Sequence, residues 1–164
     1  MRRRGARAAV AFVAVAALSA CGPAVDVSQP AAPLAGVDMD GRHHDLAELQ
    51  GSVVVVSVWA SWCGPCREEV QPLSQAEQEW GDDGLVVLGV NFKDHPDAAQ
   101  RFVEEEGATF PSVVDADGAI SIDWGVTGVP QSFLVDREGE IAAVRFGPVT
   151  DEWIADVVVP EVQG

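Results

Sequence analysis

Trp62-Cys63-Gly64-Pro65-Cys66 directly follows the apolar run Val53–Trp59, and this stretch decides the fold. The β-branched run predicts a central strand that is covered on both faces. The two cysteines then stand at a strand-to-helix junction, where their spacing lets the sulfurs meet across one helical turn. Unpaired helix N–H groups and the positive end of the helix dipole stabilise a thiolate there. A C-x-x-C motif in this setting indicates a redox-active dithiol.

The alternative for this cysteine pair is half of a zinc site. Zinc needs two more nitrogen or sulfur ligands. The remaining candidates in the chain are Cys21, His43, His44 and His95, and no second C-x-x-C or H-x-x-x-H motif occurs. We therefore predict neither a metal site nor a cofactor, and we place His43 and His44 on a solvated surface beside a turn.

Residues 1–21 resemble the export signal of a bacterial lipoprotein. Four arginines precede an apolar stretch at 8–20, which is shorter than the roughly 20 residues that a membrane-spanning helix needs. Leu18-Ser19-Ala20-Cys21 resembles a lipobox, so Cys21 is the expected lipidation site. Ordinary signal cleavage with a free Cys21 and an uncleaved short anchor are the alternatives. We expect residues 22–33 to be a flexible tether, and the protein to be anchored to the outer face of the cell membrane through its lipid.

Composition and charge limit the possible partners. Residues 21–164 suffice for one domain with a sizeable core. The chain has 10 basic and 26 acidic residues, a net charge of −16, and loss of the four leader arginines makes it −20. Such acidity argues against nucleic-acid binding and against attraction to anionic headgroups. With one of three cysteines taken by lipid, a single pair remains in an oxidising compartment. We expect a monomer.

The rest of the chain carries the pattern of an α/β domain. We expect strands at 34–37, 53–59, 85–90, 113–114, 131–135 and 140–145, and helices at 46–49, 67–80, 96–106, 120–124 and after Thr150. The first strand and an Asp40-Gly41 turn predict an N-terminal hairpin, and the last two strands predict an antiparallel hairpin. Pro72 predicts a kink in the helix at 67–80. The order is two parallel strands with helical crossovers, then a hairpin and a closing helix.

Further motifs give a resemblance to a known family. The matching stretches are Trp59–Cys66, Gly89–Asp94, Ile122–Pro130 and Phe133–Asp136. Together they resemble thioredoxin-fold proteins of the TlpA/ResA/CcmG (DsbE) family, which are membrane-tethered thiol–disulfide oxidoreductases, many of them serving cytochrome c maturation. The similarity covers about residues 34–160, and the second and third stretches point to the CcmG branch. It implies a thioredoxin-like fold, with a central mixed sheet flanked by helices, an N-terminal hairpin and a central insertion.

The resemblance implies roles for the cysteines and for the loop opposite them. Cys63 is then the exposed attacking thiolate, and the more buried Cys66 resolves the mixed disulfide. Val129-Pro130 takes the place of the family's cis-proline, so that the backbone of Val129 pairs with an extended substrate segment. Trp62 offers an apolar contact beside the cysteines. From the residues alone, Pro130 could equally be a plain proline at the start of a strand.

Proton transfer is expected to differ from that in thioredoxin. Thioredoxin keeps a buried Asp on the central strand where this chain has Ser57, which cannot act as a base. Glu69 lies three residues after Cys66 on the same helix face and matches a Glu that reductases of the family place near their cysteines. A carboxylate in this place raises the pKa of a thiol. The alternative for Glu69 is an ordinary exposed helix residue beside Glu68.

The sequence thus predicts an exported, lipid-anchored thiol–disulfide reductase that acts on a protein disulfide and is re-reduced by a membrane-embedded electron donor. The cysteine pair of apocytochrome c is the leading substrate. CcmG proteins commonly follow the cis-proline with Glu-Thr, and Gln131-Ser132 in this chain weakens the case for that client. We nevertheless place Gln131 in the substrate site. A disulfide-donating oxidase and a Cu(I)-binding module that uses the dithiol are the alternatives.

Overall fold

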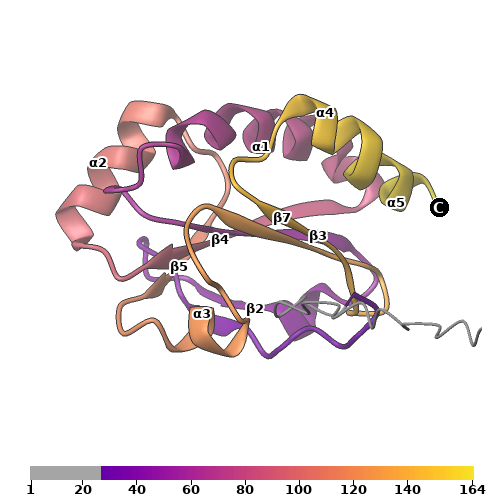
Figure 1. The fold of residues 1–164 in the computed structure, drawn as a ribbon, viewed down its shortest axis with the longest axis horizontal. Coiled ribbons are helices and arrows are strands. Elements are labelled where there is room, and N and C mark those ends of the chain that lie inside the picture. Colours follow the sequence, from indigo (N-terminus) through magenta and orange to yellow (C-terminus); the bar gives the residue numbers. More distant parts are fainter. Residues whose placement is uncertain (1–26) are drawn as a thin grey trace, which may run out of the picture.

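A five-stranded mixed sheet forms the centre of the domain (Figure 1). The computed structural model describes residues 27–164. In spatial order the strands are β5 (Ser112–Asp115), β4 (Leu85–Phe92), β3 (Val53–Trp59), β6 (Gln131–Val135) and β7 (Ile141–Phe146). β3 pairs in parallel with β4 and antiparallel with β6, and all of its residues are buried. The expected central strand and mixed sheet are confirmed.

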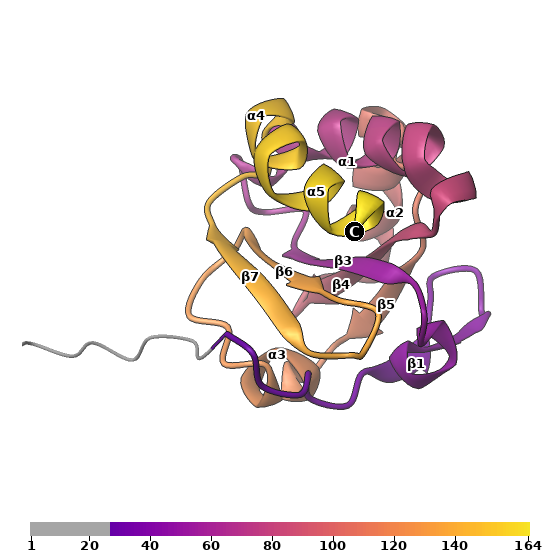
Figure 2. The ribbon, with the colours of Figure 1, turned by 90° about the vertical axis from the view of Figure 1, so that its right-hand side faces the viewer.

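Helices cover both faces of this sheet (Figures 1 and 2). One face carries α1 (Cys66–Trp80), α2 (Pro96–Glu106) and the C-terminal α4 (Asp151–Trp153), η3 (Ile154–Val158) and α5 (Val159–Gln163). The other face carries α3 (Ala119–Asp123). Alternate residues of β3 serve the two faces, since Val53 and Val55 pack with α1 while Val54 and Val56 pack in the opposite cluster.

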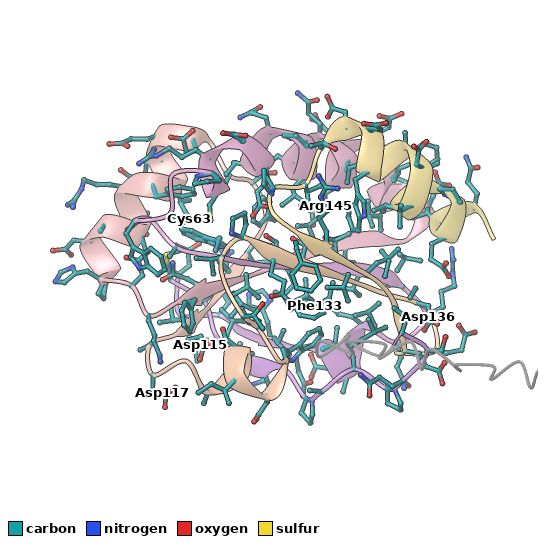
Figure 3. All side chains as sticks on the ribbon, in the orientation of Figure 1. Cys63, Asp115, Asp117, Phe133, Asp136 and Arg145 are labelled. Atoms are coloured by element: carbon teal, nitrogen blue, oxygen red, sulfur yellow. A yellow bond between two sulfur atoms is a disulfide. The ribbon has the colours of Figure 1, made fainter. Side chains whose placement is uncertain are left out.

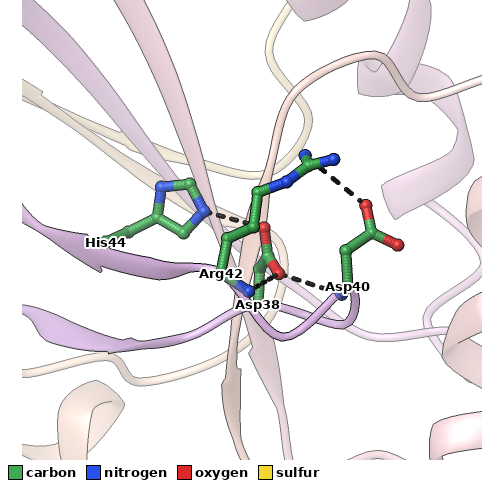
Figure 4. Close-up of polar contacts among 4 residues, drawn as sticks. All are labelled: Asp38, Asp40, Arg42 and His44. Atoms are coloured by element: carbon green, nitrogen blue, oxygen red, sulfur yellow. Dashed lines mark hydrogen bonds and ion pairs between the residues drawn. The ribbon is translucent and has the colours of Figure 1, made fainter.

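The expected N-terminal hairpin consists of β1 (Ala35–Val37) and β2 (His43–Asp45), followed by the short helix η1 (Leu46–Leu49). Asp38 bridges to Val113 of β5, so the hairpin lies along that edge of the sheet. The Asp38 carboxylate organises the turn: it accepts the N–H groups of Asp40 and Arg42, and it contacts Nε2 of His44 at 2.7 Å (Figure 4). The placement on a solvated surface holds for His43, which is exposed, whereas His44 is half-buried because it contacts Asp38.

The first described residues run along the other edge of the sheet. The Ser28 N–H donates to the Ile141 carbonyl, the Ile141 N–H donates to Gln29, and Pro30 bridges to Glu140. These contacts continue the pairing of β7 by a few residues. Cys21, the leader and most of the expected tether lie outside the described residues. Between residues 27 and 164, no helix has the length and apolarity to cross a membrane.

Candidate active site

The cysteine pair joins the end of β3 to the start of α1. Cys63 and Cys66 form a disulfide, and the Cys66 N–H contacts the Cys63 sulfur at 3.2 Å. Cys66 is fully buried, whereas Cys63 keeps 5% of its surface exposed. The expectation of an exposed Cys63 is thus wrong for this disulfide form, because most of its surface is buried. The expectation that Cys63 is more exposed than Cys66 is confirmed. The residual exposure makes Cys63 the sulfur that a partner thiol can approach.

Trp62 is the large apolar side chain beside the cysteines. It is 59% exposed, and its indole N–H donates to the Lys93 carbonyl at 3.3 Å. Its ring meets Phe92 edge-on, with 6.4 Å between ring centroids. Lys93 has a φ of 44°, a left-handed backbone conformation that is uncommon outside glycine. The loop after β4 thus holds an exposed indole next to the disulfide. Trp59 and Trp124, in contrast, are buried.

Asp94 fixes the chain just before the cysteines. Its carboxylate accepts the Ser61 N–H at 2.5 Å and the Ser61 hydroxyl at 2.7 Å, and it also accepts the Asn91 amide at 3.0 Å. Burial opposes ionisation of Asp94, but these hydrogen bonds outweigh it and lower the pKa. Asp94 is a residue of the site to which no role was assigned from the sequence. The available signal was its place directly after β4, at the same sheet edge as the C-x-x-C motif.

The loop before β6 forms the opposite wall of the site. The Val129–Pro130 peptide bond is cis, as the family resemblance implied. Val129 is half-buried and packs against the apolar cluster that contains both cysteines. The Pro130 carbonyl accepts the N–H of Gly147, which ties this loop to the end of β7.

Gln131 supports this loop from within. Its side chain is fully buried, and its Oε1 accepts the Thr127 N–H at 3.0 Å. Its Nε2 has no partner among residues 27–164. The prediction of a substrate-contacting Gln131 is therefore corrected. Because β6 is an interior strand, this side chain points into the domain and positions the cis-proline loop.

Glu69 is a buried carboxyl group one helical turn after Cys66. Its side chain is 1% exposed, so the alternative of an ordinary surface residue is excluded. Oε1 accepts the Ser57 hydroxyl at 2.8 Å, and Oε2 accepts the Val149 N–H at 3.1 Å. Burial raises its pKa to about 7, against these two hydrogen bonds, which favour ionisation. The Ser57 hydroxyl of β3 and the Glu69 carboxyl of α1 are thus hydrogen-bonded to each other close to the dithiol.

Comparison with known proteins agrees with this geometry. The Redoxin family matches residues 23–158. The "Thiol:disulfide interchange protein HelX" of Rhodobacter capsulatus is 37% identical, over 82% of this chain and 75% of that protein. The "Thiol:disulfide interchange protein DsbE" of Allochromatium vinosum is 35% identical, over 92% and 88%. A crystal structure described as a putative DsbE from Chlorobium tepidum superposes with a TM-score of 0.79, at 29% identity, and covers 85% of this chain and 99% of that one.

These matches agree with the fold, the C-x-x-C disulfide and the cis-proline loop, and all of them indicate the same family. The resemblance drawn from the motifs is confirmed, including the thioredoxin-like fold with its N-terminal hairpin. The chain belongs to the Redoxin family, and it is a thioredoxin-like thiol–disulfide oxidoreductase of the TlpA/ResA/DsbE kind whose redox centre is the Cys63–Cys66 disulfide.

Proposed function

We propose that this protein is an exported, membrane-tethered reductase of protein disulfides, with the cysteine pair of apocytochrome c as its leading substrate. The observation that carries the proposal is the pairing of a slightly exposed Cys63 with a buried Cys66, next to a cis-proline loop. The similarity to the thiol:disulfide interchange proteins HelX and DsbE supports the disulfide-exchange chemistry. The leader pattern ending at Cys21 supports the tether.

The reduced dithiol would act in two exchange steps. The Cys63 thiolate attacks one substrate sulfur, the substrate disulfide breaks, and its other sulfur leaves as a thiolate. Cys66 then gives its proton to Glu69, and its sulfur bonds to Cys63 while the second substrate sulfur leaves. The substrate gains two electrons and takes up two protons from water, and the Cys63–Cys66 disulfide remains. A membrane-embedded dithiol donor returns the two electrons.

Glu69 suits the second step because its pKa is about 7. A proton acceptor works best when its pKa lies near the working pH. Its position one turn from Cys66 places it by the sulfur that must lose a proton, whereas Ser57 on β3 can only relay one. The acid–base group of this site is therefore assigned to α1, not to the central strand.

Recognition is assigned to backbone and apolar contacts. The Val129 backbone lies two residues before the first residue of β6, so an extended substrate segment can pair with it as an added strand. Trp62 presents its exposed ring on the other side of the cysteines. Both contacts suit an unfolded chain with a local cysteine pair, because neither demands a folded partner surface.

The experiment is active-site trapping with two single variants. Cys63→Ser should abolish reduction of a model disulfide. Cys66→Ser should accumulate a mixed disulfide through Cys63, because the resolving sulfur is missing. The trapped partner is identified by mass spectrometry after non-reducing separation, with the double variant Cys63→Ser/Cys66→Ser as the blank.

Three results would contradict parts of the proposal. Residual reduction by Cys63→Ser would remove Cys63 from the attacking role. Trapped partners without a haem-attachment cysteine pair would remove apocytochrome c as the client. A measured reduction potential in the range of disulfide donors, about −120 mV, would replace the reductase with an oxidase.

A further inference from the structure

Ser132 carries a buried hydroxyl group that has no hydrogen-bond partner among the described residues. Its side chain is fully buried in β6, two residues after the cis-proline. A buried hydroxyl without a partner loses its hydrogen bonds to water without replacing them, which destabilises the fold. Such a group calls for an explanation, and use in another state of the site is one.

The register of the sheet places Ser132 beside the acid–base group. Ser132 and Ser57 are directly opposite each other in the antiparallel β3–β6 pair. Opposite residues point to the same face with Cβ atoms about 4.5–5.5 Å apart. The Ser57 hydroxyl donates to Glu69, so that face is the α1 side, and Ser132 must lie on it too. A rotation about χ1 brings two hydroxyls at this spacing within hydrogen-bond reach.

The hydrogen bonds of Glu69, with Ser57 and the Val149 N–H as donors, are those of its ionised form. Both carboxyl oxygens accept a hydrogen, one from Ser57 and one from the Val149 N–H. Once protonated, the carboxyl group has to donate. The Val149 N–H cannot accept a hydrogen, but the Ser57 hydroxyl can. Ser57 then needs a new acceptor for its own hydrogen, and the unpartnered Ser132 oxygen lies opposite it.

We propose that Ser132 is a positioning residue that accepts the Ser57 hydroxyl whenever Glu69 holds the proton taken from Cys66. In the ionised state the order is Ser57 to Glu69, and in the protonated state it reverses to Glu69, then Ser57, then Ser132. No bond between heavy atoms changes, and the proton itself stays on Glu69. The inference rests on the proposed role of Glu69.

Other titratable or charged groups near Glu69 are the two cysteines and one arginine. Cys63 lies just before α1, and Cys66 is its first residue. Arg145 of β7 is the register partner of Ser132, so it stands on the same face, and its Nε donates to the Pro148 carbonyl at 3.1 Å (Figure 3). Arg145 is the same in all Ser132 variants, and in the disulfide form neither cysteine titrates.

The test follows the Glu69 carboxyl carbon by NMR against pH in the disulfide form, with Glu69→Gln to assign the signal. Ser132→Ala should lower the pKa of Glu69 by about half to one pH unit, because the protonated form loses its relay. Ser132→Thr keeps a hydroxyl and should restore the original value. Ser74→Ala, at a buried serine that instead accepts the Thr109 N–H, should leave the titration unchanged.

The double variant separates a relay from a packing effect. In a Ser57→Ala background, Ser132→Ala should no longer move the pKa of Glu69, since Ser132 acts through Ser57. An unchanged or raised pKa in the single variant overturns the inference. So does an equal shift in both backgrounds. The role of Glu69 itself fails by a different result, namely an unchanged thiol titration in Glu69→Gln.

Discussion

The buried carboxyl group of Glu69 lowers the stability of the fold but gives the site an acid–base group. Its carboxyl group sits between β3 and the loop before α4, with a hydrogen bond to each oxygen, yet burial still raises its pKa to about 7. The sequence carried a signal for this burial. Cys66, Glu69, Leu73 and Ala76 recur at the helical period of the buried α1 face, so Glu69 lies on an apolar stripe.

Glu69→Gln should remove a pH dependence of stability. The folded pKa of about 7 lies above the ordinary value of 4.5, so the folded state holds its proton longer than the unfolded chain. Stability is therefore full below about pH 4.5 and falls as the pH rises to about 7, by roughly 3 kcal/mol. Urea unfolding of both disulfide-intact proteins across this range measures the difference. The exposed Glu68→Gln is the matched control, and parallel profiles for wild type and Glu69→Gln would contradict the assignment.

Gln131 and Ser132 could not be assigned from the sequence in the same way. A polar side chain in a short strand is expected to face solvent, because strands alternate between two faces. β6 is flanked by β3 and β7 and covered on both faces, so both residues are buried. Only the sheet order shows this, and that order depends on long-range pairing that local patterns do not encode.

At the scale of elements, the contact of β4 with β5 holds the end of β3 in place. The Trp59 indole N–H donates to the Ser112 hydroxyl at 3.0 Å across β4, and Trp59 stacks on Phe102 of α2 at 4.6 Å between centroids. Gly89 leaves the room for this bond, since a Cβ there would lie 2.1 Å from the Ser112 oxygen. The strand positions were predictable from their apolar runs, but this close approach was not.

Gly89→Ala should destabilise the domain by about 2 kcal/mol, because the added methyl group overpacks a buried junction. It should also slow disulfide reduction, since Trp59 leads into the cysteine loop. Thermal unfolding and a turnover assay measure the two effects. Gly81→Ala is the matched control: Gly81 has a helical φ of −61° and open space around its Cα, so its substitution should be neutral or slightly stabilising. Equal stability of the two variants would contradict the packing account.

For the whole molecule, charge decides how it can meet a membrane. The chain has 26 acidic residues, and four of its 10 basic residues lie in the leader. An acidic domain is repelled by anionic headgroups, and residues 27–164 contain no helix able to span a bilayer. On the proposed function, the lipid at Cys21 provides the attachment.

Cys21→Ser should move the exported protein from the membrane fraction to the soluble fraction, at low salt as well as at high salt. Cell fractionation with immunodetection measures this, and Cys63→Ser, which keeps Cys21, should stay with the membrane. Retention of Cys21→Ser on the membrane would show a second anchor or an uncleaved leader.

The pairing of residues 28–30 with the start of β7 has a geometric consequence for such an anchored protein. That pairing lies next to Asp136, and Figure 3 shows Asp136 and Cys63 in opposite halves of the domain along its long axis. Residues 22–27, even fully extended, span only about 20 Å. The dithiol would therefore lie on the side of the domain remote from its attachment point. A soluble client could reach the dithiol without any rearrangement of the protein. Reduction of the disulfide by a membrane-embedded donor would require the whole domain to rotate about its attachment point.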